Sequence, residues 1–218
     1  MLAKSFIFTL GLVFALGTSA AEEKKTAKNE TPKVLFETSI GDILIELYPK
    51  EAPITVENFL KYIDDGFYNG VIFHRVVPGF VVQAGGYTFD FQRKETRNPI
   101  KNESDNGLKN TIGTLSMART NVINSATSQF FINLRNNSSL DFGKGHGYAV
   151  FGKVIDGFKV VKTIEKAPRG MFRVFPEAPN EAIIIEKAAR VSSDTKKVPE
   201  RKNEEKKKAV KSKKETTK

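Results

Sequence analysis

The sequence predicts a mostly β domain, either a barrel or a sandwich, that carries two helices. Most of its apolar runs are short, and several alternate with polar residues at the two-residue period of a strand. Segments rich in Gly, Asn and charged residues separate these runs, and only two segments have helical spacing. Many short strands with two helices are typical of a β-barrel or β-sandwich with helical caps, and the pattern does not choose between them.

The domain is expected to begin with a β-hairpin. Two apolar runs at 34–38 and 43–47 flank the turn signal Ser-Ile-Gly-Asp at 39–42. In the second run, Ile43 and Ile45 alternate with Leu44 and Glu46. That period predicts a strand with one buried face.

The first helix is expected after Pro53. Four apolar residues follow at the spacing of one helical face: Val56, Phe59, Leu60 and Ile63. Thr55 is the predicted N-cap because its hydroxyl can accept a free backbone N–H, and Gly66 is the predicted stop.

The rest of the domain alternates between strands and loops. The expected strands are 71–77, 80–83, 114–118, 129–133, 148–154 and 182–191. A long loop is expected over 85–110, and a second helix over 157–166, which Pro168 ends.

The string FHRVVPGF at 73–80 places a single arginine, Arg75, inside an apolar strand. A guanidinium stays charged at any working pH and is costly to bury without a partner. The apolar run that follows contains a single Gln, Gln83. An apolar segment with two isolated hydrogen-bonding side chains predicts a hydrophobic pocket that orients a ligand.

Together with GTLSMAR at 113–119 and SQFFIN at 128–133, this string resembles the cyclophilin family of peptidyl-prolyl isomerases, over roughly residues 34–191. The segments 66–70 and 118–129 resemble the bacterial exported members in particular. The resemblance implies a closed eight-stranded antiparallel β-barrel with a helix over each open end. It also implies that X-Pro peptide bonds are the substrate.

The family's catalytic arginine falls on Arg75, so the resemblance implies that Arg75 donates to the prolyl nitrogen. The alternative is that Arg75 forms only a structural ion pair. His74 is expected to point to the other side of the strand, because successive strand residues face opposite ways. We therefore interpret His74 as a packed histidine and not as an acid–base catalyst.

The resemblance also implies an apolar cup for the proline ring. Its walls would be Phe80, Val81, Phe131 and Leu140. Strand alternation then assigns Phe131 to the pocket and Phe130 to the core.

Five further residues are implied to contact the peptide. Gln83 and Gln129 would bind its backbone, and Ala118 and Arg119 would contact the residue before proline. Tyr148, where many members have histidine, can still donate one hydrogen bond.

Two residues depart from the family pattern. Ser139 stands where members commonly have a tryptophan, on which cyclosporin-type inhibitors depend. Arg119 stands where asparagine is frequent, and its added charge would bias the choice of substrate.

The composition excludes several classes of site. The 218 residues include no Cys, so no disulfide or catalytic thiolate can form. With only two His residues, a structural zinc site is not expected. Prolyl isomerisation needs no cofactor, and none is expected.

The chain is expected to carry appendages around a single domain at 34–194. Residues 1–21 have the form of a signal peptide: Lys4, an apolar run at 6–16, and small residues before a cleavage site after Ala20 or Ala21. The alternative is an uncleaved N-terminal anchor. Export to a bacterial periplasm is the expected location, with secretion as the alternative, and 22–33 is expected to be a polar linker.

The C-terminal segment 195–218 is Lys-rich. Its 11 basic and 4 acidic residues give a charge of +7, most of the chain's +10. With few apolar residues, it is expected to be a disordered tail. It is either a solubilising appendage or a tether to anionic surfaces, and nucleic acid is not an expected partner.

The predicted function is therefore a monomeric peptidyl-prolyl isomerase that acts on unfolded or folding exported proteins. The alternative is a non-catalytic proline-binding or chaperone module that uses the same groove. Arg75 favours the enzyme, because a module that only binds would not need a donor at the prolyl nitrogen. A third interpretation makes the basic tail the functional part and the barrel its scaffold.

Overall fold

The computed structural model describes residues 31–198 except 144 and 173–174. The predicted signal peptide, most of the linker and residues 199–218 of the tail lie outside the described residues. Within them, no helix is long and apolar enough to cross a membrane.

Eight strands form a closed antiparallel barrel, in the order β1-β10-β3-β4-β6-β5-β7-β2. The strands are β1 Lys33–Thr38, β2 Gly41–Leu47, β3 Val71–Val77, β4 Val81–Thr88, β5 Thr114–Met117, β6 Phe130–Asn133, β7 Val150–Asp156 and β10 Ile184–Val191. The barrel implied by the family resemblance is confirmed. Closure pairs both edges of every strand in the barrel.

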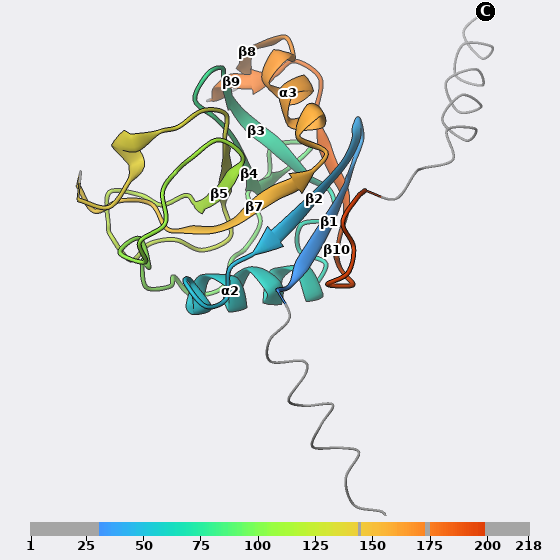
Figure 1. The fold of residues 1–218 in the computed structure, drawn as a ribbon. Coiled ribbons are helices and arrows are strands. Elements are labelled where there is room, and N and C mark those ends of the chain that lie inside the picture. Colours follow the sequence, from blue (N-terminus) through green and yellow to red (C-terminus); the bar gives the residue numbers. More distant parts are fainter. Residues whose placement is uncertain (1–30, 144, 173–174, 199–218) are drawn as a thin grey trace, which may run out of the picture. The chain divides into compact units, whose positions relative to one another are not determined.

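Two helices cover the barrel. α2, Pro53–Asp64, lies at one end and α3, Phe158–Lys166, at the other (Figure 1). A short 3₁₀ turn, η1, spans Ser138–Leu140. Tightly packed rings fill the space between α2 and the strands: Phe36, Phe59, Tyr68, Phe130 and Phe151.

The predicted N-cap at Thr55 is wrong, because the N-cap is Ala52, three residues earlier, and α2 begins at Pro53. Thr55 is buried within the first turn. The carboxylate of Glu103, from the long loop, accepts the backbone N–H groups of Ile54 and Thr55 at 3.1 and 2.8 Å. It also accepts the Thr55 hydroxyl at 2.7 Å. A residue distant in sequence therefore satisfies this helix end.

The predicted stop at Gly66 is confirmed. The helix ends at Asp64, and Gly66 has a φ of +65°, a left-handed conformation that glycine adopts without strain.

Strand β4 is longer than predicted, since residues 85–88 were assigned to the loop. At Gly85 a Cβ atom would lie 2.6 Å from the carbonyl oxygen of Ser128. Glycine therefore lets β4 continue alongside the chain that leads into β6. The glycines at 85 and 86 suggested a loop, but here glycine allows close backbone packing within a strand.

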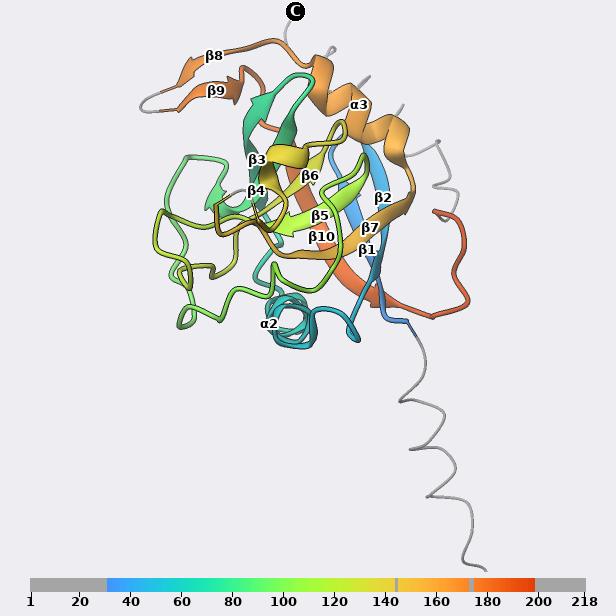
Figure 2. The ribbon, with the colours of Figure 1, turned by 60° about the vertical axis from the view of Figure 1, so that its left-hand side comes forward.

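A second hairpin was not predicted. Strands β8, Arg169–Phe172, and β9, Phe175–Pro179, pair with each other outside the barrel. The prolines in this stretch argue against a strand in the sequence. Figure 2 shows the hairpin extending beside β3 and near α3, and β9 packs against β3.

Candidate active site

A row of paired residues crosses three neighbouring strands of the barrel. Arg75 on β3 lies opposite Gln83 on β4, and Gln83 lies opposite Phe131 on β6. Directly paired residues project from the same face of a sheet. The register therefore places the predicted donor, a polar anchor and an aromatic wall side by side.

The next row faces the core. Phe73 pairs with Ala84, which pairs with Phe130, and all three are buried in the main hydrophobic cluster. Phe130 is core and Phe131 is not part of that cluster, as alternation predicted.

A β-bulge at His74 separates the two rows on β3. Phe73 pairs with Ala84 and Arg75 with Gln83, so two steps along β3 match one step along β4. Simple alternation would place Phe73 and Arg75 on the same face. The bulge instead turns Arg75 away from the core, which is a usual role of a bulge beside a functional site.

These side chains line a cavity of about 290 Å³. Its nine lining residues are Arg75, Phe80, Val81, Gln83, Ala118, Arg119, Phe131, Leu140 and Tyr148. Every one of them was predicted to contact substrate. Gln129 does not line the cavity, but its side-chain oxygen accepts the Gln83 amide at 2.9 Å.

Arg75 is held by two neighbours. Its Nε donates to Glu177 Oε2 at 2.7 Å, and its NH1 lies 3.5 Å from Gln83 Oε1. The ion pair that was the alternative for Arg75 therefore exists. It does not remove Arg75 from the cavity, which the same side chain lines.

His74 is packed, as expected. It is 3 % exposed, and its ring centroid lies 4.8 Å from that of Tyr87 and 5.9 Å from that of Phe175. Burial lowers its pKa to about 4, and the charge of Arg75 acts in the same direction. The imidazole is therefore neutral near pH 7.

Arg119 and Tyr148 form one wall of the cavity. The Arg119 guanidinium lies 4.6 Å from the centre of the Tyr148 ring, which in turn lies 5.6 Å from the Phe131 ring. Arg119 also donates to the Gly147 carbonyl at 3.1 and 3.0 Å and to that of Thr120 at 2.9 Å. Three nitrogens of the Arg119 guanidinium therefore already donate to backbone carbonyls of the protein.

Ser139 is exposed in the η1 turn, whereas the next residue, Leu140, lines the cavity. Ser139 is not among the lining residues. No bulky side chain from position 139 extends the apolar wall.

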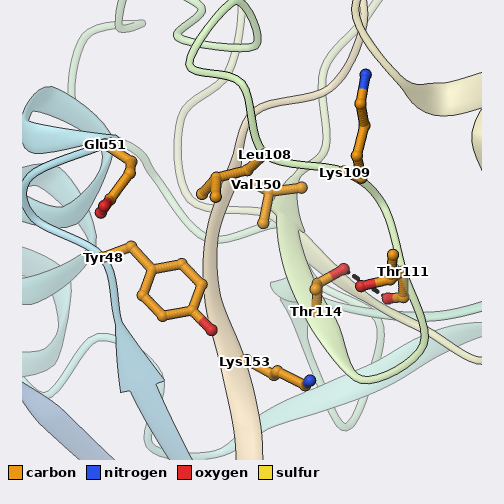
Figure 3. Close-up of a pocket in the computed structure, with 8 residues that line it drawn as sticks. All are labelled: Tyr48, Glu51, Leu108, Lys109, Thr111, Thr114, Val150 and Lys153. Carbon is orange, nitrogen blue, oxygen red and sulfur yellow. Dashed lines mark hydrogen bonds between the residues drawn. The ribbon is translucent and has the colours of Figure 1, made fainter.

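A second cavity, of about 250 Å³, lies elsewhere on the barrel (Figure 3). Its lining includes Tyr48, Glu51, Lys109 and Lys153, and none of the predicted site residues. Its lining also includes the apolar side chains of Leu108 and Val150. Within the described residues, no cluster of His, Asp and Glu could hold a metal ion.

Glu177 is the site residue that the sequence analysis missed. It is 102 positions from Arg75 and lies on a strand that was not predicted. No local pattern marks it, because only the packing of β9 on β3 brings the two side chains together.

Comparison with known proteins agrees with this geometry. The model of the family described as cyclophilin type peptidyl-prolyl cis-trans isomerase/CLD matches residues 33–190. Peptidyl-prolyl cis-trans isomerase A of Dickeya dadantii is 48 % identical over 163 residues, covering 74 % of this chain and 86 % of the relative. Isomerase B of Escherichia coli is 49 % identical over 157 residues, covering 70 % and 96 %.

A solved structure is also similar. The crystal structure of a Cryptosporidium parvum cyclophilin type peptidyl-prolyl cis-trans isomerase aligns with a TM-score of 0.63 at 29 % identity, covering 74 % of this chain and 98 % of that one. The sequence strings, the closed barrel and these matches agree: the chain belongs to the cyclophilin family and is a peptidyl-prolyl cis-trans isomerase.

Proposed function

We propose that this isomerase binds an X-Pro segment in the 290 Å³ cavity and that Arg75 stabilises the twisted amide. The observation that supports this role is that Arg75 lines the same cavity as the apolar side chains of Phe131 and Leu140. A proline ring in that cup would lie within reach of a permanently charged donor.

The chemistry of the bond explains why a donor would help. Resonance gives the amide C–N bond partial double-bond character, and the barrier to rotation is about 20 kcal/mol. Twisting breaks this resonance and returns a lone pair to the prolyl nitrogen. A donor aimed at that nitrogen binds the twisted state better than either planar state, which is the requirement for catalysis. An apolar surrounding strengthens the interaction.

The other lining residues would position the peptide. Gln83, whose orientation is fixed by its bond to Gln129, would contact the peptide backbone. Ala118 and Arg119 would contact the residue before proline. Phe80 and Val81 would complete the apolar cup, and Tyr148 would donate one hydrogen bond to the peptide.

We further propose that the clients are exported proteins that fold in a bacterial periplasm. The signal-peptide pattern at 1–21 supports export, and the bacterial relatives are consistent with it. The Lys-rich tail would add contact with anionic surfaces, and the isomerase domain would act as a monomer.

The decisive experiment is NMR exchange spectroscopy of a short Ala-Pro peptide with catalytic amounts of the protein lacking residues 1–21. Exchange between cis and trans signals is expected, and it should fall sharply in an Arg75→Ala variant. Line broadening without exchange would support the alternative of a proline-binding module. Unchanged exchange in Arg75→Ala would remove Arg75 from the mechanism.

A further inference from the structure

We propose that Glu177 is a positioning residue for Arg75, so that the β8–β9 hairpin outside the barrel contributes to catalysis. This inference rests on the proposed role of Arg75 as the donor to the prolyl nitrogen. It adds a residue from outside the cavity lining to the residues that determine the rate.

The contact itself has a geometry suited to positioning. Glu177 Oε2 accepts the Nε–H of Arg75 at 2.7 Å. A guanidinium is a planar fork with five N–H donors, so a bond at Nε fixes the plane and directs the two terminal nitrogens. Within the described part of the chain, the only other polar contact of Arg75 is the long one from NH1 to Gln83. No other described residue accepts from NH2, so this nitrogen remains available to a substrate.

Arg75 needs such a restraint. Its side chain is 40 % exposed and has several rotatable bonds, and it stands at the rim of an open cavity. A long, half-exposed arginine that lacks a partner samples many rotamers, and ordering it during each catalytic event would raise the barrier. A carboxylate that holds it beforehand removes that cost.

Glu177 is itself held by the hairpin. Phe175 lies two residues earlier on β9. The Phe175 ring packs 4.8 Å from Tyr87 and 5.9 Å from His74, the residue of the β3 bulge. Ala178, the next residue, is buried and pairs with Gly170 on β8. β9 thus contacts β3 at two neighbouring residues, Phe175 at His74 and Glu177 at Arg75, and the hairpin packs on the bulge that turns Arg75 away from the core.

The carboxylate could also act in the opposite sense, by drawing the positive charge of Arg75 away from the substrate. Which effect is larger, orientation of Arg75 or weakening of its charge, depends on which Arg75 nitrogen donates to Glu177. Glu177 accepts from Nε and not from the terminal nitrogens. We therefore expect the gain in orientation to exceed the loss of electrostatic attraction.

The test compares Glu177→Ala, Glu177→Gln and the control Glu181→Gln, in the protein lacking residues 1–21. Glu181 is exposed and lies four residues away without a contact to Arg75. The pair is half exposed, so a loss in kcat of about three- to ten-fold is expected for Glu177→Ala, with KM nearly unchanged. Glu177→Gln should lose less, because its amide oxygen can still accept the Nε–H. Glu181→Gln should match the wild type.

Two readouts separate positioning from a structural role. The ¹⁵N NMR signal of Arg75 Nε–H should be protected from exchange in the wild type and lose that protection in Glu177→Ala. In an Arg75→Ala background, Glu177→Ala should cause no further loss, since the residue through which it acts is gone. If Glu177→Ala does not fold, as judged by circular dichroism, Glu177→Gln keeps the side-chain volume and provides the same comparisons.

Wild-type or higher kcat in Glu177→Ala, or an equal loss in the Arg75→Ala background, would overturn the positioning role. Failure of the two proposals can be told apart. Full activity in Arg75→Ala would reject the catalytic role of Arg75, and with it the inference about Glu177. An inactive Arg75→Ala variant beside a fully active Glu177→Ala variant would reject only the inference.

Discussion

The two faces of the β3–β4–β6 wall differ in what they do, although the residues involved are neighbours in sequence. Phe130 packs among core rings, whereas Phe131 lines the cavity. His74 is buried and neutral, whereas Arg75 is charged and half exposed. One set of strands thus carries both core side chains and the lining of the candidate site. The following predictions test that separation.

The largest effect is expected on the core face. Phe130 is fully buried, with its ring 5.6 Å from Phe36 and 5.7 Å from Phe59. Phe130→Ala should lower the free energy of unfolding by about 3–5 kcal/mol, measured by urea denaturation. Phe131→Ala should cost less stability, because one side of its ring faces the cavity, and should mainly raise KM. Equal loss of stability in the two variants would contradict the separation of the faces.

Arg75→Ala should act in the opposite way, on rate with little change in stability. Because a charge-assisted hydrogen bond is worth about 1.5–3 kcal/mol and water would also enter, we expect kcat/KM to fall by about 10²–10³-fold. The unfolding free energy should change by less than about 1 kcal/mol, since the ion pair with Glu177 is half exposed. A large loss of stability with retained activity would make Arg75 a structural residue.

His74 should make the wall sensitive to acid. Its pKa is lowered to about 4 in the folded protein, against 6.5 when exposed. Folding therefore disfavours the protonated form: the stability is fully present above pH 6.5 and is lost as the pH falls toward 4. By pH 5 the loss is about 2 kcal/mol from this residue.

The measurement is urea denaturation of the wild type and of His74→Phe at pH 7.5 and pH 5. The variant removes the titrating group and keeps a ring for the contacts with Tyr87 and Phe175. It should lose less stability between the two pH values than the wild type does. An identical pH dependence in both proteins would assign the acid sensitivity to other groups.

Ser139 offers a smaller change at the edge of the cavity. Cyclosporin-type inhibitors should bind weakly, because position 139 presents no ring. Adding a tryptophan would bury about 50–100 Å² of apolar contact, which is worth about 1–2.5 kcal/mol. Ser139→Trp should tighten the inhibitor accordingly in a competition assay and leave catalysis on small peptides intact. Tight binding by the wild type would show that the alignment at Ser139 is wrong.

The smallest effect on catalysis is expected from the tail. The backbone N–H of Val198 donates to Asp156 at 2.6 Å, so a truncation should begin after Val198. Deleting 199–218 should leave the rate on a neutral peptide unchanged and abolish low-salt sedimentation with anionic vesicles, since charge attraction is screened within about 8–10 Å. If the full-length protein does not sediment at low salt, the tail is a solubilising appendage.

Much of the wall could be predicted from sequence because it is made of regular strands. Alternation placed Phe130 and Phe131 on opposite faces, and the family position assigned Phe131 to the pocket. The family resemblance then named every residue that lines the cavity. Where a strand keeps its two-residue period, sequence position determines the face on which a side chain lies.

Other features depended on contacts between distant segments. The cap of α2 is Glu103, 48 positions from Thr55. The continuation of β4 through Gly85 depends on the close approach of Ser128. The threonine before an apolar run predicted an N-cap, and the glycine pair predicted a loop. In both cases a contact with a distant segment determined the structure instead.

The sequence by itself determined the strand periods and the presence of a permanently charged side chain in an apolar strand, because these follow from residue type and alternation. The apolar cup followed from the family resemblance. Only the tertiary structure decided where the bulge at His74 turns Arg75 and which carboxylate holds it. The physical reason is that a bulge and a long-range ion pair depend on the partner strand. The residues next to Arg75 in the chain do not reveal that β4 pairs opposite it or that β9 packs beside it.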